Sequence, residues 1–398
     1  MENSVNGKQK LSRGLVALMA VTAGLAVANI YYCQPILKDM AASLGVGEEA
    51  VGNIPLLTQV GYGLGLFFIV PLGDKLDKKR LILSLLLLLA VALLATCFVA
   101  TLGPMLLCSL LIGILSVSPQ VVLPMAAALD KENRGKTIGT IYTGLLVGIL
   151  GARVFSGLVA EYIGWRYVFG LSAVLVAALA ALLQVFLPVV RHEFGGHYGH
   201  LLRSTLQQVG RFPLLRRSAL LGGLVFGVFC SFWTTLTFHL GGPPFHYGPD
   251  IIGLFGLVAI AGALVAPVFG KKVDKGDSRR SLLLSVALLV AGVLVLKFFP
   301  TNLAAFVLAV VLLDVGVQAT HVTNVARIYT LDDRSLSRIN TVYLTSYFLG
   351  GALGTFFGVQ CWKIGGWSLV TAQMLLWSLV AAAVVASEKK GAANEQGP

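Results

Sequence analysis

The sequence predicts an all-α integral membrane protein in which twelve transmembrane helices form two pseudo-symmetric six-helix bundles around a central cavity. Three observations lead to this prediction: the composition, the length of the apolar runs and the placement of the basic residues. Hydrophobic residues make up 57% of the 398 residues and charged residues only 12%, which is far outside the usage of soluble globular proteins. The chain therefore suits a lipid environment.

Twelve apolar runs are long enough to cross a membrane. A helix needs about 20 apolar residues to span a hydrocarbon core of roughly 30 Å. The runs are residues 15–40, 51–72, 81–100, 105–129, 137–160, 167–189, 218–240, 251–269, 281–299, 303–328, 341–361 and 368–385. No small-residue cleavage site follows the first run, so we expect it to stay as an anchor rather than to be removed as a signal peptide.

The longest polar stretch between two runs divides the chain into two groups of six. We predict a first bundle at residues 1–189, a cytoplasmic linker at 190–217 and a second bundle at 218–398. In the linker, Leu201, Leu206 and Val209 alternate with polar side chains, a pattern typical of a short helix on the membrane surface. The halves also repeat, since "PLGDKLDK" from Pro71 resembles "PVFGKKVDK" from Pro267. Parallel repeats of this kind place a binding site at their interface.

The net charge of +12 would suggest a nucleic-acid partner in a soluble protein. Most of the 30 Lys and Arg residues, however, fall in alternate loops, which share one side of the membrane when the amino terminus is cytoplasmic. This distribution follows the positive-inside rule. It predicts that both termini are cytoplasmic, and that the charge sets the membrane orientation and indicates no nucleic-acid partner.

Two charged residues lie deep within predicted helices, Arg153 in the fifth and Asp314 in the tenth. Each costs about 2.5 to 3.5 kcal/mol on insertion scales, so such residues are rarely present without a function. Counted along the helices, both lie at similar depth in opposite halves. Asp314 is either a proton carrier or cation site, because burial favours the neutral form of a carboxylate, or part of a structural ion pair. Arg153 binds an anionic group of a ligand, holds Asp314 ionised or only braces the helices.

Polar residues form stripes on the first and fourth helix of each half. On the tenth helix, spacings of three and four residues keep the stripe on one face with Asp314. The residues are Gln318, His321 and Asn324 on the tenth helix, Asn29, Tyr32 and Gln34 on the first, Ser116 and Gln120 on the fourth, and Ser231, Trp233, Thr234, Thr235 and His239 on the seventh. Lipid does not accept such faces, so we expect them to line a central cavity. The two histidines can instead be hydrogen-bonded helix residues with no further role.

Small residues recur at every fourth position of the fifth and eleventh helices. The fifth helix carries Gly144 and Gly148, followed by alanine and serine, and the eleventh carries Gly350, Gly354 and Gly358. Such patterns allow the backbones of membrane helices to approach closely. We predict helix interfaces at these positions, either static or able to slide.

No feature of the sequence predicts a metal, a cofactor or an enzyme. The five cysteines lie singly in five different runs and are interpreted as packing residues. His192, Glu193, His197 and His200 in the linker resemble a metal site only in composition, so we expect a solvated linker. The sequence contains no HExxH, GxSxG or GxxxxGK pattern, which argues against an intramembrane enzyme or a nucleotide-driven pump.

The motifs resemble those of the major facilitator superfamily, in its bacterial twelve-helix drug–proton antiporter branch. The resemblance covers nearly the whole chain and rests on "NIYYCQPIL", "PLGDKLDKKRL", "GILGARVFSGLVAEYIGWR", "FWTTLTFHLGGPPFHYG" and "DVGVQATHV". It implies that the first and fourth helices of each half line the cavity, and that the second, fifth, eighth and eleventh form the interface between the halves. The loop after the second helix matches the family's signature, which latches the cytoplasmic side in the outward-facing state. The matching residues are Asp74, Lys75, Lys78, Lys79 and Arg80.

The sequence departs from the branch at three places. In the loop after the second helix, Val70 and Asp77 stand where the signature has glycine. In the fifth helix, Gly151 is followed by Ala152 and Arg153, where the branch usually has a Gly-Pro pair. The fourth helix lacks the arginine that is usual in the branch. The resemblance implies proton-driven export of a small organic molecule by alternating access across the bacterial cytoplasmic (inner) membrane. We expect a monomer whose partners are its substrate, protons and the lipid bilayer. Uptake or facilitated diffusion of a metabolite stays open, as does a receptor or scaffold that transports nothing.

Overall fold

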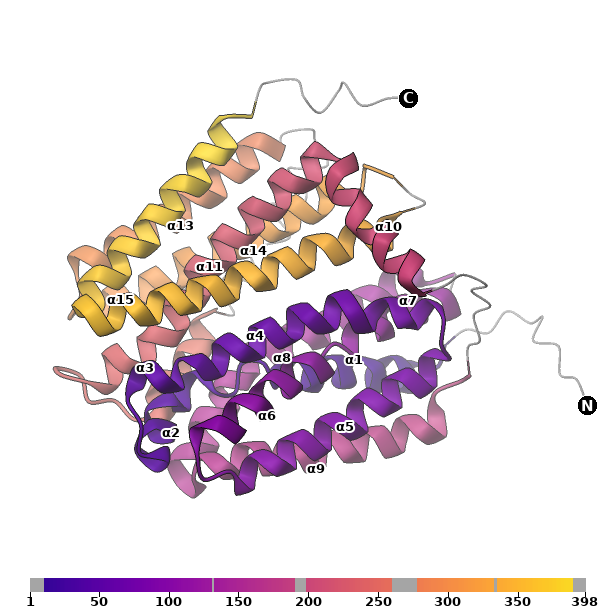
Figure 1. The fold of residues 1–398 in the computed structure, drawn as a ribbon, viewed down its shortest axis with the longest axis horizontal. Helices are drawn as coiled ribbons and strands as arrows, with labels where there is room; N and C mark the ends of the chain where they lie inside the picture. The colour runs from indigo at the N-terminus through magenta and orange to yellow at the C-terminus, as the bar shows by residue number, and fades with distance from the viewer. Residues whose placement is uncertain (1–10, 131, 190–197, 260–277, 333–334, 389–398) are drawn as a thin grey trace, which may run out of the picture.

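The computed structural model describes residues 11–130, 132–189, 198–259, 278–332 and 335–388, which form helices and short connections. The first group of helices, hereafter the first half, comprises α1 (Arg13–Ala28), η1 (Gln34–Ile36), α2 (Leu37–Leu44), α3 (Glu48–Val51), α4 (Asn53–Leu64), η2 (Gly65–Ile69), η3 (Val70–Asp74), α5 (Lys78–Phe98), α6 (Leu102–Leu115), α7 (Pro119–Leu129), α8 (Arg134–Ile163) and α9 (Trp165–Phe186). The second half comprises α11 (Pro213–Gly241), a helix at Pro249–Ala259, α13 (Ser278–Phe298), α14 (Leu303–Ile328) and α15 (Leu336–Ala386). The linker helix is α10 (Tyr198–Arg211), and the two halves lie side by side (Figure 1).

The predicted apolar runs fall on helices, although some runs are broken and others joined. Nine helices within the described ranges are long and apolar enough to cross a membrane. α15 contains the last two runs, separated by a kink at Gly365 and Gly366, and the eighth run is described only as far as Ala259. The first and fourth runs are interrupted next to Pro35 and Pro119, because proline has no N–H to continue a helix.

The exposed faces of the helices are apolar. On α5, Leu87, Leu88, Val91 and Leu94 are each more than half exposed, which in water would form an unfavourable patch. α11, in contrast, is buried along 89% of its apolar window and therefore lies inside the second half. Outward-facing leucines around a buried central helix are the arrangement that a lipid environment favours.

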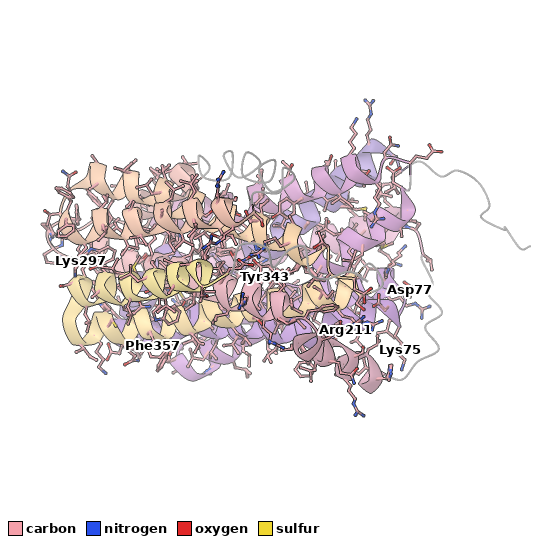
Figure 2. The ribbon with its side chains drawn as sticks, turned by 90° about the horizontal axis from the view of Figure 1, so that it is seen from above. Lys75, Asp77, Arg211, Lys297, Tyr343 and Phe357 are labelled. Atoms are coloured by element: carbon pink, nitrogen blue, oxygen red, sulfur yellow. The ribbon has the colours of Figure 1, made fainter. Side chains whose placement is uncertain are left out.

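Loops that the sequence assigns to opposite sides of the membrane lie at opposite ends of the molecule. Figure 2 places Lys75, Asp77 and Arg211 toward one end and Lys297 at the opposite end. The positive-inside rule predicts that the first three are cytoplasmic and that Lys297 lies outside. We therefore refer to a cytoplasmic end and an outer end in this predicted sense.

The glycine ladders pack helices together within each half. A Cβ added to Gly148 of α8 would lie 2.1 Å from the backbone oxygen of Gly24 in α1, and one added to Gly354 of α15 would lie 2.0 Å from that of Gly227 in α11. The other ladder contacts are Gly144 with Ala20, Gly350 with Gly223, and Gly358 with Ser231. The resemblance related these ladders to the interface between the halves. They instead join α8 to α1 and α15 to α11, each pair inside one half.

The halves meet along other faces of the same helices. A Cβ on Gly157 of α8 would lie 2.3 Å from the backbone oxygen of Pro249, and Thr355 of α15 donates a hydrogen bond to Gln59 of α4 at 2.9 Å. Closer to the outer end, the indole of Trp362 and the Glu48 carboxylate form a further hydrogen bond of 2.8 Å. These contacts extend from the middle of the helices to the outer end, so that end is closed.

Candidate functional site

Arg153 lies in the middle of α8 between the two halves, with a side chain that is 1% exposed. Its Nε donates a hydrogen bond to Oε1 of Gln34 at 2.8 Å. The guanidinium carbon lies 3.9 Å from the ring centroid of Trp233, 5.0 Å from that of Tyr31 and 5.6 Å from that of Phe229. At such distances an aromatic face attracts a cation. We refer to Arg153, Gln34, Tyr31, Phe229 and Trp233 as the arginine cage.

Several polar atoms of the cage have no hydrogen-bond partner. They are Nη1 and Nη2 of Arg153, Nε2 of Gln34 and Nε1 of Trp233, all of them buried. Buried polar groups in native proteins are nearly always hydrogen-bonded, so exceptions require a physical reason. Because Trp233 belongs to the second half and the other two residues to the first, the unsatisfied atoms gather where the halves meet.

Asp314 is the second buried charge, 2% exposed on α14. Its Oδ2 has no hydrogen-bond partner. It interacts electrostatically with Arg153, but among the described residues the two side chains form no ion pair. The structural ion pair that the sequence left open is therefore not formed in this conformation, and the carboxylate is free for another partner.

The rest of the α14 stripe connects α14 to its neighbours. Nδ2 of Asn324 donates to the backbone oxygen of Ser218 at 3.3 Å, and Nδ1 of His321 lies 3.2 Å from the hydroxyl of Tyr343. Gln318 is only partly buried. His321 thus has the hydrogen bond that the sequence allowed as the alternative to a ligand role, whereas Asn324 also keeps a buried Oδ1 without a partner.

On α11, Trp233 is the predicted residue that the fold brings into the cage. The hydroxyl of Thr235 donates to the backbone of Ser231 at 2.8 Å, and the hydroxyl of Thr234 is buried without a partner. His239 lies 2.8 Å from the carbonyl oxygen of Pro300 and stacks on Trp367 at a centroid distance of 4.3 Å. His239 is therefore part of an aromatic cluster away from the cage.

The residues of the predicted stripe on the first helix do not all face the same neighbour. Oδ1 of Asn29 accepts a hydrogen bond from Ser172 of α9 at 2.8 Å, and the ring of Tyr32 packs 5.5 Å from that of Phe155. Only Gln34 reaches the cage. On the fourth helix, Gln120 is partly buried beside Tyr62. The sequence predicted that Asn29 and Tyr32 line the central cavity, but both instead face helices of their own half.

Tyr31 and Phe229 are cage residues that were absent from the predicted site. Tyr31 precedes Gln34 by three positions and Phe229 precedes Trp233 by four, so each pair shares one helical face. The signal was present in the sequence, but aromatic residues beside polar ones in a membrane helix are hard to distinguish from lipid-facing residues.

Among the described residues, the signature loop forms no latch between the halves in this conformation. The Asp77 carboxylate accepts a hydrogen bond from the backbone N–H of Arg80 at 3.0 Å and caps α5. Nζ of Lys79 donates to the backbone oxygen of Gln184 at 2.7 Å. In the described part of the chain Asp74 makes no ion pair with the second half, and Lys75 is exposed whereas Lys78 is buried. The family's latch belongs to the outward-facing state, so its absence fits a closed outer end.

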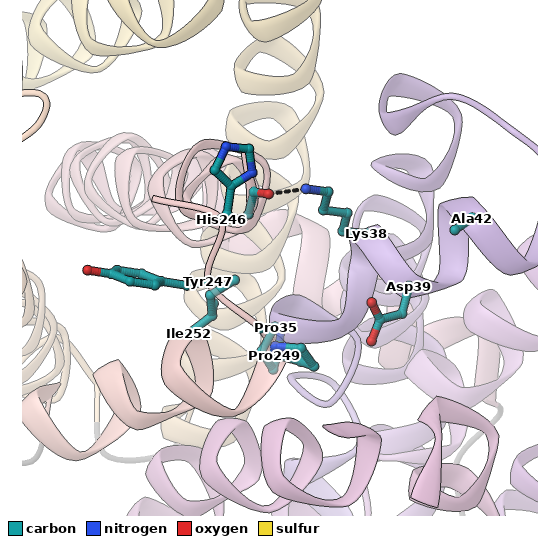
Figure 3. Close-up of a pocket in the computed structure, with 10 residues that line it drawn as sticks. Pro35, Lys38, Asp39, Ala42, His246, Tyr247, Pro249 and Ile252 are labelled. Atoms are coloured by element: carbon teal, nitrogen blue, oxygen red, sulfur yellow. Dashed lines mark hydrogen bonds between the residues drawn. The ribbon is translucent and has the colours of Figure 1, made fainter. Parts of the chain in front are cut away.

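A pocket of about 340 Å³ lies between the halves at the outer end, lined by residues from the ranges 35–42 and 241–252 (Figure 3). Beside it, Nζ of Lys38 donates to the carbonyl oxygen of Gly241 at the end of α11, where the helix dipole favours a cation. A Cβ on Gly253, next in sequence to the lining residue Ile252, would lie 2.4 Å from the backbone oxygen of Arg153. Close backbone packing thus joins the two halves between the pocket and Arg153 of the cage.

Of two predicted features, the first lies largely and the second entirely outside the described residues. They are the linker cluster, of which only His200 is described, and the second copy of the loop repeat after Pro267. In the ranges that are described, no three His, Cys, Asp or Glu side chains form a metal-binding group.

Comparison with known proteins identifies the family. Residues 17–358 match the family model described as Major Facilitator Superfamily. The Escherichia coli (strain K12) protein named putative uncharacterized transporter YgaY is 41% identical over 360 residues, which cover 90% of this chain and 91% of that protein. The Streptomyces coelicolor probable transporter SCO4007 is 30% identical over 368 residues, which cover 92% of this chain and 85% of that protein.

A solved structure agrees with the fold. A mutant of the nucleoside transporter NupG superposes with a TM-score of 0.78 at 13% identity, over 94% of this chain and 98% of that one. At this identity the similarity shows the fold alone. Together with the family match and the relatives, it leads to one conclusion: the chain belongs to the Major Facilitator Superfamily and is a multi-pass secondary transporter, not an enzyme.

Proposed function

We propose that the protein carries a small organic molecule across the bacterial cytoplasmic membrane by alternating access, with Asp314 as the proton carrier. The observation that supports this most is the presence of two buried charges from opposite halves, Arg153 and Asp314, each with polar atoms that lack a partner. Charges kept only for structure would be paired, because an unpaired buried charge is costly. A receptor or scaffold would not need such a site between its halves.

Alternating access is supported by the burial of the cage and by a contact between the halves on its outer side. Arg153 is almost inaccessible to solvent. On the outer side, the Thr237 hydroxyl donates to the backbone oxygen of Gln34 at 2.6 Å, which joins the halves next to the cage. Because the glycine ladders lie within each half, each half can move as one body while such contacts between the halves break and form.

The direction of transport has two candidates. Export in exchange for protons is the first, supported by the resemblance to drug–proton antiporters. Uptake together with a proton is the second, favoured by the unpartnered nitrogens of Arg153, because these donors suit an anion. For export of a neutral molecule, one proton moving inward down about 100 mV supplies about 2.3 kcal/mol, enough for a roughly 40-fold concentration ratio. For uptake of a monoanion with one proton, the charges that cross the membrane cancel, so the pH difference is the driving force.

The proton role can be tested in proteoliposomes with Asp314→Asn. The substrate is first sought as a compound that stabilises the purified protein in a thermal-shift screen of metabolites and drugs. We expect Asp314→Asn to exchange this compound across the membrane but to lose its uphill accumulation under a pH gradient. Glu161→Gln, which changes an exposed carboxylate at the outer end of α8, is the control and should keep both activities. Undiminished gradient-driven accumulation by Asp314→Asn would contradict the proposal.

A further inference from the structure

We propose that the arginine cage binds the carboxylate of the transported molecule, and that this molecule is a small organic acid with a planar, apolar body. The inference rests on the proposed function, because it names the substrate class of the same site. Its support comes from the donors, the charges and the rings of the cage.

The unpartnered polar atoms of the cage are all donors. Nε of Arg153 donates a hydrogen bond to Oε1 of Gln34. Because arginine can only donate, the amide oxygen of Gln34 has to face Arg153, which leaves the NH₂ group of Gln34 without a partner. The remaining atoms are Nη1 and Nη2 of Arg153, Nε2 of Gln34 and Nε1 of Trp233. An indole N–H also only donates. A ligand that satisfies this set has to supply acceptors, and the fork of Nη1 and Nη2 matches the two oxygens of a carboxylate.

The charges near the cage favour a monoanion. Arg153 supplies one positive charge, which one carboxylate neutralises while Asp314 carries its proton. A phosphate or another dianion would leave a surplus negative charge close to Asp314, which already interacts with Arg153. A cation would be repelled by the guanidinium. In a buried site such uncompensated charge is expensive, so a monocarboxylate fits best.

The rings around the guanidinium indicate the body of the ligand. Tyr31, Phe229 and Trp233 lie with their ring centroids 3.9 to 5.6 Å from the guanidinium carbon. A carboxylate bound to this guanidinium therefore arrives among aromatic surfaces, and these stack best on a planar, apolar group. Binding sites for small molecules commonly combine such apolar walls with a few placed polar groups.

The test compares acids with their own amides on the purified full-length protein. The probes are benzoate, cinnamate and indole-3-acetate, each paired with benzamide, cinnamamide or indole-3-acetamide. Binding is measured by thermal shift and by isothermal titration calorimetry, without any gradient. We expect at least one acid to bind the unmodified protein about 10-fold or more tightly than its amide. This preference should disappear in Arg153→Gln and weaken in Arg153→Lys, because lysine lacks the planar fork.

Arg166→Gln is the matched control. The guanidinium of Arg166 also lies over a tryptophan, 4.3 Å from the ring centroid of Trp165, but it is bonded to Ser43 and Val99 near the outer end. This variant should keep the acid preference.

The proposal is overturned if none of the acids binds better than its amide, or if the preference persists in Arg153→Gln. Should Arg153→Gln fail to fold, the acid–amide comparison on the unmodified protein and on Arg153→Lys still decides. Because this binding needs no pH gradient, its failure is distinct from a failure of proton coupling by Asp314.

Discussion

Replacing Gly148 with alanine is expected to destabilise the first half, whereas the same change at Gly151 is not. Both glycines lie inside α8, about one turn apart. A Cβ on Gly148 would lie 2.1 Å from the carbonyl oxygen of Gly24 and 2.5 Å from its Cα, but a Cβ on Gly151 would meet no atom within 4 Å. Because the obstacle at Gly148 is backbone, no side-chain rotation can relieve the clash.

The size of the effect follows from these distances. An ordinary Cβ contact is 3.4–4 Å, so α1 and α8 would have to separate by about 1.3–1.9 Å. Overpacking of this kind costs about 1–3 kcal/mol. An alanine in open space on a helix is instead favourable by about 0.5–1 kcal/mol. We therefore expect Gly148→Ala to lose its helical circular dichroism at a lower SDS fraction in mixed micelles than Gly151→Ala. Equal midpoints for the two variants would refute the close approach of α1 and α8.

Two further predictions concern the ends of the molecule. Lys38→Met removes a cation from the end of α11, where it is favoured. It should therefore increase labelling by a membrane-impermeant maleimide of a cysteine placed at Ile252, which lines the outer pocket and is buried. Unchanged labelling would show that this contact does not keep the outer end closed. Arg211→Ala should lower the free energy of unfolding by less than about 1 kcal/mol, because the Arg211 side chain is 60% exposed in its 3.1 Å pair with Asp332 and exposed pairs contribute little. A larger loss in the micelle assay would contradict this.

The helices could be predicted from the sequence because lipid leaves the backbone few alternatives. Each apolar run must satisfy its own hydrogen bonds, which makes it a helix. What joins or interrupts the runs was harder to predict. Pro35 and Pro119 break two runs, whereas α15 continues through two runs with only a kink at Gly365 and Gly366. These details depend on local backbone geometry that hydrophobicity alone does not describe.

The candidate site was predicted less completely than the fold. Periodicity shows which residues share a face of a helix, but not which neighbour that face meets. Asn29 and Gln34 both belong to the predicted stripe, yet Asn29 bonds to Ser172 of α9 and only Gln34 reaches Arg153. The glycine ladders show the same limit, because the spacing in α8 predicted close packing without identifying α1 as the partner. Pairing between helices depends on their tilt and order, which the sequence of one helix does not contain.

The charge of the bound molecule bears on whether the proton and the substrate move together or in exchange. A carboxylate held by Arg153 would come close to the Asp314 carboxylate, and two like charges at short range favour protonation of one of them. The acid and the proton would then bind together and leave together, which is cotransport. A cationic substrate would instead displace the proton, which is exchange. The acid–amide comparison therefore also tests the direction of transport. A carboxylate in the cage makes uptake the stronger candidate. Preferential binding of a cation would favour export.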